Sequence, residues 1–254
     1  MRISYGKLRV PVHRISGDDV LACEVSVEVL GDNFAPAYTE GDNTNVVATD
    51  TMKNFILHES LAYDGTSLEG LLARLGRRFI ATYPVMEAVR MSARELRFDR
   101  LGERVYARSA DDYGVATVEP DGTVRGGRHG MMLLKTRGSA FTRFARDEYT
   151  TLPERGDRPL LIRLDADWRY RDDRTVESKA VRDHLAATFD DFVSESIQHL
   201  VHEMGTRLLA DSDEIAEISF TAENHTRDPV GADGERKVYT DPFPAQGLIT
   251  LTLP

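Results

Sequence analysis

The chain has 254 residues, 41% of them hydrophobic and 29% charged, which is typical of a globular protein with a buried core. Its net charge of -10 argues against non-specific binding to nucleic acid or to an anionic membrane surface. The single cysteine, Cys23, excludes an intrachain disulfide and a Cys-rich metal site. With no secretory signal and no apolar run of roughly 20 residues, we expect a cytoplasmic protein.

The first half of the chain predicts strands, then helices, then strands. The segment Asn45–Asn54, NVVATDTMKN, favours a strand that leads into a helix, with Asp50 or Thr51 as the N-cap. A second helix is expected to begin at Ser67, because the leucines that follow share one helical face. Alternating apolar and polar residues predict strands at 8–12, 25–29, 86–99 and 103–109.

The second half has the same order of elements. A helical region is expected over 178–210, with a break at 193–196. Strands are predicted at 113–119, 124–136, 160–170, 214–222 and 246–253. These patterns indicate an α+β protein of two domains, residues 1–111 and 112–254, with antiparallel sheets that are covered by helices on one face. The open faces and edges of such sheets would need a partner subunit.

The segment Leu134–Arg158, LKTRGSAFTRFARDEYTTLPERGDR, has the most specific motif. It closely resembles the signature of urate oxidase (uricase) in its Leu-Lys-Thr start and in the spacing of Ser139, Phe141, Phe144, Tyr149, Leu152 and Arg158. Tyr5-Gly6-Lys7 and the segment VVATDTMKN resemble two further motifs of that family. Gln198 and Gly247–Ile249 also fall where uricases have these residues, so the resemblance runs through nearly the whole chain.

The resemblance implies a fold, an assembly and an activity. Uricases have tandem tunnelling-fold (T-fold) domains, dimers close the sheets into a barrel, and two barrels form a homotetramer with active sites at subunit interfaces. They oxidise urate with molecular oxygen to 5-hydroxyisourate and hydrogen peroxide in purine degradation. The resemblance implies no metal and no organic cofactor, with oxygen as co-substrate, and no nucleic-acid or membrane partner.

The resemblance also implies a role for each residue that would bind urate. Phe141 would stack on the purine, because an aromatic face suits a planar heterocycle. Arg158 would hold two adjacent acceptors with its guanidinium fork, and Gln198 would grip the opposite edge through its amide. Ile197 and Leu152 would line the pocket. The alternatives are a core Phe in a short helix, a surface ion pair of Arg158 with Asp157 or Glu154, a solvated Gln and ordinary packing.

The remaining residues concern proton transfer and oxygen. Thr49 and Asp50 would come from the neighbouring subunit, and Lys7 would relay protons with Thr49 through a bound water. From the alternation alone, Lys7 lies on the face opposite Leu8 and Val10 and is equally compatible with a solvated position.

Asn224 would cap the oxygen position above the ring, and His225 would join the relay. Many uricases have a residue between this Asn and this His, whereas here the two are adjacent. If the strand register places them on opposite faces, only one can reach the site.

Three other functions compete with this interpretation. His199 and His202 suggest a metal hydrolase, but their spacing matches neither HExxH nor HxxEH. The glycine-rich turn at Gly126–Gly130 suggests a flavin or nicotinamide oxidase, but it lacks the GxGxxG spacing before a helix. A uricase-like purine-binding protein without turnover is the non-enzymatic alternative.

Overall fold

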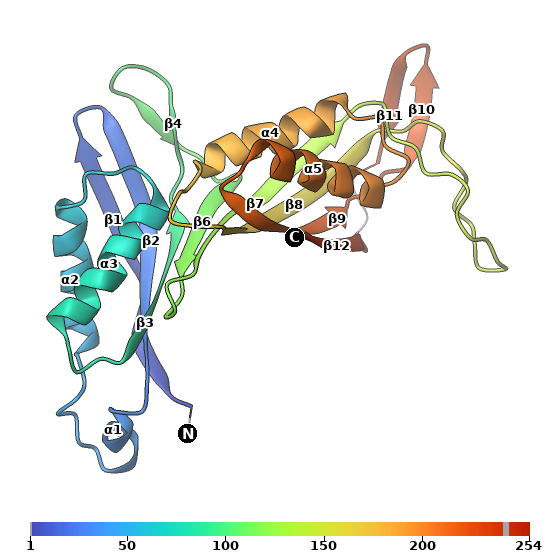
Figure 1. The fold of residues 1–254 in the computed structure, drawn as a ribbon. Helices are drawn as coiled ribbons and strands as arrows, with labels where there is room; N and C mark the ends of the chain where they lie inside the picture. Colours follow the sequence, from blue (N-terminus) through green and yellow to red (C-terminus); the bar gives the residue numbers. More distant parts are fainter. Residues whose placement is uncertain (1, 241–243) are drawn as a thin grey trace. The chain divides into compact units, whose positions relative to one another are not determined.

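The computed structural model describes residues 2–240 and 244–254 and divides the chain into two compact units (Figure 1). The first unit is Met1–Gly127 with Asp172–Glu177, and the second is Arg128–Arg171 with Ser178–Pro254. The expected domain boundary after residue 111 follows the repeated order of elements and stays a prediction. Each unit consists mainly of antiparallel strands with two long helices, so the fold class is α+β.

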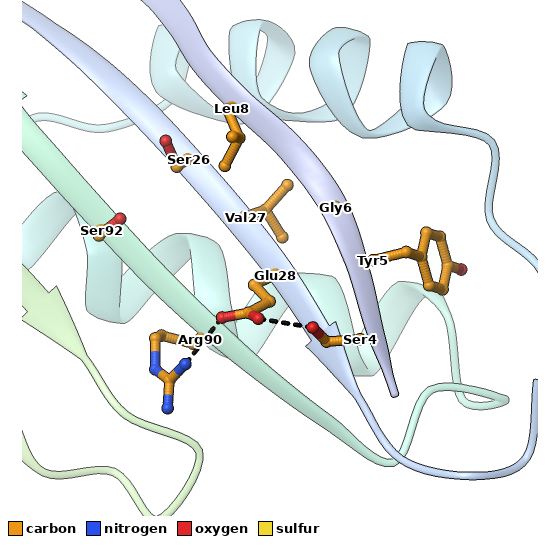
Figure 2. A pocket seen from close by; sticks show the side chains of 9 residues that line it. All are labelled: Ser4, Tyr5, Gly6, Leu8, Ser26, Val27, Glu28, Arg90 and Ser92. Carbon is orange, nitrogen blue, oxygen red and sulfur yellow. Dashed lines mark hydrogen bonds and ion pairs between the residues drawn. The ribbon is translucent and has the colours of Figure 1, made fainter. Parts of the chain in front are cut away.

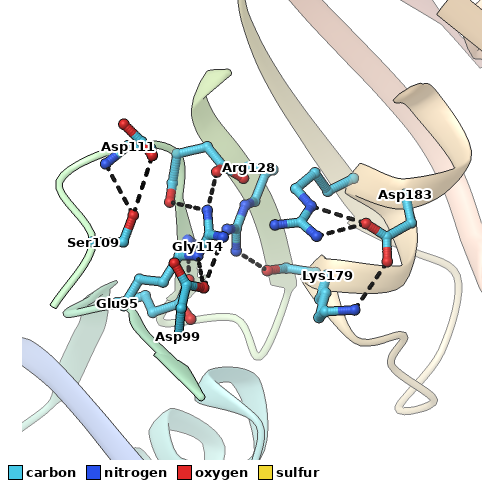
Figure 3. Close-up of polar contacts among 12 residues, drawn as sticks. Glu95, Asp99, Ser109, Asp111, Gly114, Arg128, Lys179 and Asp183 are labelled. Carbon is cyan, nitrogen blue, oxygen red and sulfur yellow. Dashed lines mark hydrogen bonds and ion pairs between the residues drawn. The ribbon is translucent and has the colours of Figure 1, made fainter. Parts of the chain in front are cut away.

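The sheet of the first unit has the order β1-β2-β3-β6. Its strands are β1 (Ser4–Ser16), β2 (Asp19–Leu30), β3 (Ala88–Glu95) and β6 (Tyr113–Val118), with a separate hairpin of β4 (Phe98–Arg100) and β5 (Tyr106–Arg108). Glu95 of β3 accepts a hydrogen bond from the amide of Gly114 in β6 at 2.7 Å, which ties the two strands together beyond their ladder (Figure 3).

Helices α2 (Thr49–Leu61) and α3 (Leu68–Thr82) pack on one face of this sheet, and the short α1 (Ala35–Thr39) precedes them. The core lies between these layers, where Val25, Val27 and Val29 of β2 are fully buried in one cluster with the leucines of α3. Ser67 caps α3 by accepting a hydrogen bond from the amide of Gly70, as the sequence predicts.

The sheet of the second unit has the order β7-β8-β9-β12. Its strands are β7 (Val124–Lys135), β8 (Leu160–Tyr170), β9 (Ile215–Asn224) and β12 (Gly247–Leu253), and β10 (Pro229–Asp233) pairs with β11 (Arg236–Tyr239) in a separate hairpin. Helices α4 (Ser178–Asp191) and α5 (Ile197–Asp211) carry the buried stripes of this unit. In the first turns of α4, Lys179 pairs with Asp183 at 3.0 Å (Figure 3).

Most predicted elements are confirmed, including the break between α4 and α5, but three expectations need correction. Residues 40–48 form no strand, because the amide of Val47 bonds to the Tyr5 hydroxyl at 2.9 Å rather than to a ladder. Helix α2 begins at Thr49 after Ala48, so neither Asp50 nor Thr51 is its N-cap. The glycine-rich segment Gly126–Gly130 lies within β7 instead of forming a turn. Throughout the described residues, none of the helices has the length and apolarity to cross a membrane.

Candidate active site

The predicted site residues fall into two groups, one in each unit. Group A is Lys7, Thr49 and Asp50 in the first unit. Group B is Phe141, Leu152, Arg158, Ile197, Gln198, Asn224 and His225 in the second unit.

In group A, β1 and the start of α2 lie close together. Lys7 pairs with Val27, whose side chain is fully buried under the helices, and directly paired residues in an antiparallel ladder share a face. Lys7 is therefore on the helix-covered face, together with Val10, and the expectation of opposite faces for Lys7 and Val10 is wrong. The reason is an irregularity of β1 between these two residues.

The Asp50 carboxyl, in the first turn of α2, interacts with two lysines. The ammonium of Lys53 holds the pKa of the Asp50 carboxyl below its ordinary value, and the positive charge of Lys7 adds a smaller effect of the same sign. Asn54 donates a further hydrogen bond to this carboxylate at 3.2 Å. The polar residues of this segment thus bond to one another within the first turns of α2.

The first turn of α2 has free amide groups. The N-cap Ala48 has no side chain that can accept a hydrogen bond, so no side chain within the described residues caps this helix. The first amides of a helix lack intrahelical partners and carry the positive end of its dipole, which favours an anion. Tyr5 fixes this end, because its hydroxyl holds the amide of Val47 two residues before Thr49.

In group B, the loop between β7 and β8 is fastened to the segment before α5. The amide of Ala140 donates to the carbonyl of Ser194 at 2.8 Å, and the amide of Ser194 donates to Gly138 at 3.1 Å. Ser139 and Ser194 are both buried and form a parallel bridge. These bonds hold Phe141 close to the beginning of α5, where Ile197 and Gln198 lie.

Lys135 gives this connection a second anchor. Its ammonium is almost fully buried and donates to the carbonyl of Phe192, one residue beyond the end of α4, at 2.7 Å. The Leu-Lys-Thr start of the motif therefore has a structural role, which the sequence did not assign. The signal was present, since a lysine inside a buried strand needs a partner.

Arg158 is the cation of group B. Its amide bonds to Ser139 at 2.9 Å, and its guanidinium carbon lies 5.7 Å from the centre of the Phe141 ring. Its Nε is buried and has no hydrogen-bond partner among the described residues. Burial lowers the pKa of Arg158 from its ordinary value, with a smaller effect of the charge of Arg155.

The alternative of a surface ion pair for Arg158 is not what the structure shows. Asp157 accepts from the amides of Gly138 and Ser139, at 2.6 and 3.3 Å, and Glu154 accepts from the amide of Arg143 at 3.0 Å. Both carboxylates hold the loop instead of Arg158. The guanidinium is left facing an aromatic ring with an unused donor, which suits a planar anion.

Phe141 is a half-buried residue of an irregular loop, held by two hydrogen bonds with Arg155 at 2.8 and 3.0 Å, and it does not begin a helix. The ring of Phe144 stacks on it at 4.9 Å between centroids and 11° between planes. At the start of α5, Ile197 is buried and Gln198 is exposed, while Ser196 caps the helix by accepting from the amide of His199. Leu152 is exposed.

Asn224 and His225 do not share a face. Asn224 ends β9 opposite the buried Ile162, and so it continues the helix-covered face. The Nε2 of His225 lies 3.6 Å from the Glu223 carboxylate, and its Nδ1 is 3.3 Å from the amide nitrogen of Gln246. This Nε2 is buried and makes no hydrogen bond to any described residue.

The residues that suggested a metal site or a nucleotide site are placed elsewhere in the fold. Within residues 2–240 and 244–254, no cluster of three or more His, Cys, Asp and Glu side chains could hold a metal ion. The glycine-rich segment leads into further strand rather than into the first turn of a helix, which is where a dinucleotide motif would bind phosphate.

Comparison with known structures identifies the class of fold as that of urate oxidases. A uricase from Bacillus fastidious superposes with a TM-score of 0.91 at 32% identity, covering 99% of this chain and 93% of that one. The uricase of Arthrobacter globiformis gives a TM-score of 0.89 at 30% identity, covering 100% of this chain and 93% of that one.

Sequence comparison gives the same result. The pattern of the Uricase family matches residues 3–121 and 124–250. The uricase of Haloferax volcanii is 39% identical over 93% of this chain and 88% of its own length. The chain belongs to the uricase family.

Proposed function

We propose that this protein oxidises urate with molecular oxygen to 5-hydroxyisourate and hydrogen peroxide, without a metal or an organic cofactor. The reaction balances with one water: urate, oxygen and water give 5-hydroxyisourate and peroxide. Two electrons pass from the purine to oxygen, and the water supplies the new hydroxyl group. The protein then has to bind a planar anion, manage protons and exclude bulk water.

The observation that best supports this function is the Nε of Arg158 beside the Phe141 ring, which is buried without a hydrogen bond to any residue that the structure describes. A planar anion stacked on Phe141 would place its acceptors within reach of the guanidinium, whose fork can donate two parallel hydrogen bonds. Gln198, exposed in the first turn of α5, offers both a donor and an acceptor to another edge of the purine.

Group A supplies the proton chemistry in this proposal. Lys7 and Thr49 would exchange protons with the bound urate through a water, and the free amides at the start of α2 would favour its negative charge. Asn224, on the helix-covered face, would hold oxygen above the ring. His225 lies on the other side of β9, so we assign it to supporting the relay through Glu223 rather than to contact with urate.

We further propose that the chain assembles as a homotetramer of T-fold barrels, and that group A of one subunit meets group B of its neighbour. Mixing two inactive variants tests this arrangement. Thr49→Ala and Arg158→Ala each damage one group, and co-expressed subunits would form some sites with both groups intact. Random pairing in dimers predicts recovery of roughly a quarter of the wild-type activity. No recovery in demonstrated mixed oligomers would show that both groups of a site come from one chain.

The test of the activity itself is urate consumption in air, with peroxide measured in parallel and with protein treated with a chelator beforehand. We expect one peroxide for each urate consumed, unchanged by the chelator, and a large loss of rate in Lys7→Met. If folded protein binds a xanthine analogue but consumes no urate, the chain is a purine-binding protein without turnover. In that case the adjacent pair Asn224–His225 is the first place to look for the lost chemistry.

A further inference from the structure

The strand β1 changes phase just after Lys7. Tyr5 and Lys7 pair with the buried valines Val29 and Val27, and after the irregularity Val10 pairs with the buried Val25. In an uninterrupted strand, odd and even positions point to opposite faces. Lys7 and Val10 are three positions apart, and yet both face the helices, because one extra residue is absorbed between them.

A β-bulge at Leu8 and Arg9 absorbs this residue. These two residues together oppose the single residue Ser26 of β2. Arg9 has a φ of 55°, in the left-handed region that non-glycine residues rarely adopt, and its amide donates to the Ser26 hydroxyl at 3.0 Å. The hydroxyl of Ser26 thus satisfies an amide that the bulge removes from the ladder. Bulges of this kind re-aim side chains next to functional sites.

Gly6, next to Lys7, is the second feature that sets the pairing of β1 with β2. A Cβ atom at this position would collide with the backbone carbonyl of Val27, the residue paired with Lys7. Only glycine lets β1 approach β2 this closely. On the far face of the sheet, Gly6, Leu8 and Ser26 line a pocket of about 330 Å³ together with Glu28 (Figure 2).

We propose that Gly6, Arg9 and Ser26 are positioning residues that set the face of β1 on which the Lys7 ammonium lies. Without the bulge, the segment Tyr5–Lys7 would slip by one residue, and Lys7 would oppose Glu28 instead of Val27. The ammonium would then turn into the pocket on the far face, away from Thr49. The consequence for turnover rests on the proposed role of Lys7, whereas the consequence for register does not.

Kinetics provide the first test. Arg9→Val puts a β-branched residue where the left-handed conformation is required, and we expect kcat to fall about 100-fold or more, the lower end of the range for general acid–base effects. The affinity for a xanthine analogue should stay the same, because group B is untouched. Arg9→Gly should keep kcat, since glycine adopts this conformation readily. Ser26→Ala should lower kcat, and Ser26→Thr, which keeps the hydroxyl, should restore it.

A matched control separates strain from position. Gly17, in the turn of the same hairpin, also has a positive φ of 61° and open space around it. Gly17→Val should lower the melting temperature without lowering kcat. If Gly17→Val and Arg9→Val lower kcat equally at equal loss of stability, or if Arg9→Val retains kcat, the proposed consequence for turnover is wrong, and the cysteine pairs described next decide whether the register proposal stands.

The second test reads the register directly and does not depend on any activity. The pair Lys7→Cys and Val27→Cys should form a disulfide in the Arg9 protein, and the pair Lys7→Cys and Glu28→Cys should not. With Arg9→Val added, the preference should reverse. An unchanged preference would overturn the proposal even if Lys7 proves catalytic. A reversed preference in a protein that consumes no urate would keep the register proposal and reject the proposed function.

Discussion

Groups A and B are both held by hydrogen bonds to neighbouring segments, but they differ in which polar groups are left without a hydrogen bond among the described residues. In group A the Asp50 carboxylate is already bonded within α2, and the free groups are backbone amides at an uncapped helix start. In group B the helix start is capped by Ser196, and among the described residues the Nε of Arg158 and the Nε2 of His225 are buried without a hydrogen bond. The difference agrees with the proposed division of roles, in which group B recognises the shape and charge of urate and group A supplies a positive environment and a proton.

Of the changes that test this difference between the two groups, we expect the largest effect on activity from a substitution of Arg158. Arg158→Lys keeps the charge but loses the fork, so we expect kcat/KM for urate and the affinity for a xanthine analogue to fall together by about 100-fold. Steady-state kinetics and calorimetric titration measure both quantities. Arg155→Lys, at an exposed arginine of the same loop, is the control and should change neither. Unaltered analogue binding in Arg158→Lys would remove group B from recognition.

We expect a smaller effect from a substitution that tests the difference between the uncapped start of α2 and the capped start of α5. Ala48→Ser adds a capping side chain to α2, and we expect it to raise the free energy of unfolding by about 0.5–2 kcal/mol. It should also lower turnover, because the new hydroxyl competes for an amide that would otherwise face the substrate. Urea unfolding and urate kinetics check the two effects. A variant that is more stable and equally active would show that these amides do not serve the site.

The smallest effect concerns a pair on the second sheet that belongs to neither group. His129 lies 2.8 Å from Asp167, and this hydrogen bond raises the pKa of His129 above its ordinary value. Its contribution to stability is then complete below the ordinary pKa of histidine and disappears as the pH rises through the raised value. His129→Gln should destabilise the protein by less than about 1 kcal/mol at low pH, because the pair is partly exposed. Unfolding measured across this pH range should show the difference shrinking as the pH rises; a difference that grows would contradict the assignment.

The sequence was sufficient for most of the elements, because long alternating strands and leucine stripes have strong periodicity, and for the family, because its motifs keep their spacing. It was insufficient where a single side-chain hydrogen bond takes the place of the backbone hydrogen bonds between strands. Residues 46–48 are as apolar as a strand, but the Tyr5 hydroxyl takes the amide of Val47. The role of Lys135 likewise depends on a carbonyl of Phe192, 57 residues away, which no local pattern encodes.

The face of β1 on which Lys7 lies also could not be predicted from the sequence. Alternation predicts it only if the phase of a strand is constant, and one left-handed residue at Arg9 resets that phase. The relation of Asn224 to His225 was foreseen as a question of register, and the pairing of β9 with β8 answers it for Asn224.

The bulge in β1 has a consequence for how this hairpin tolerates changes of length. It divides β1 into two segments that pair with β2 in different registers: Val10 and the residues after it, and the segment with Tyr5 and Lys7. Insertions at the turn between Ser16 and Asp19 would lengthen the turn of the hairpin without changing the pairing of Lys7 with Val27. A single residue inserted or removed between Lys7 and Val10 would instead change the size of the bulge, and it would shift the register of Lys7 relative to β2. Chain length at this one point, as much as residue identity, therefore decides whether Lys7 lies on the helix-covered face of β1.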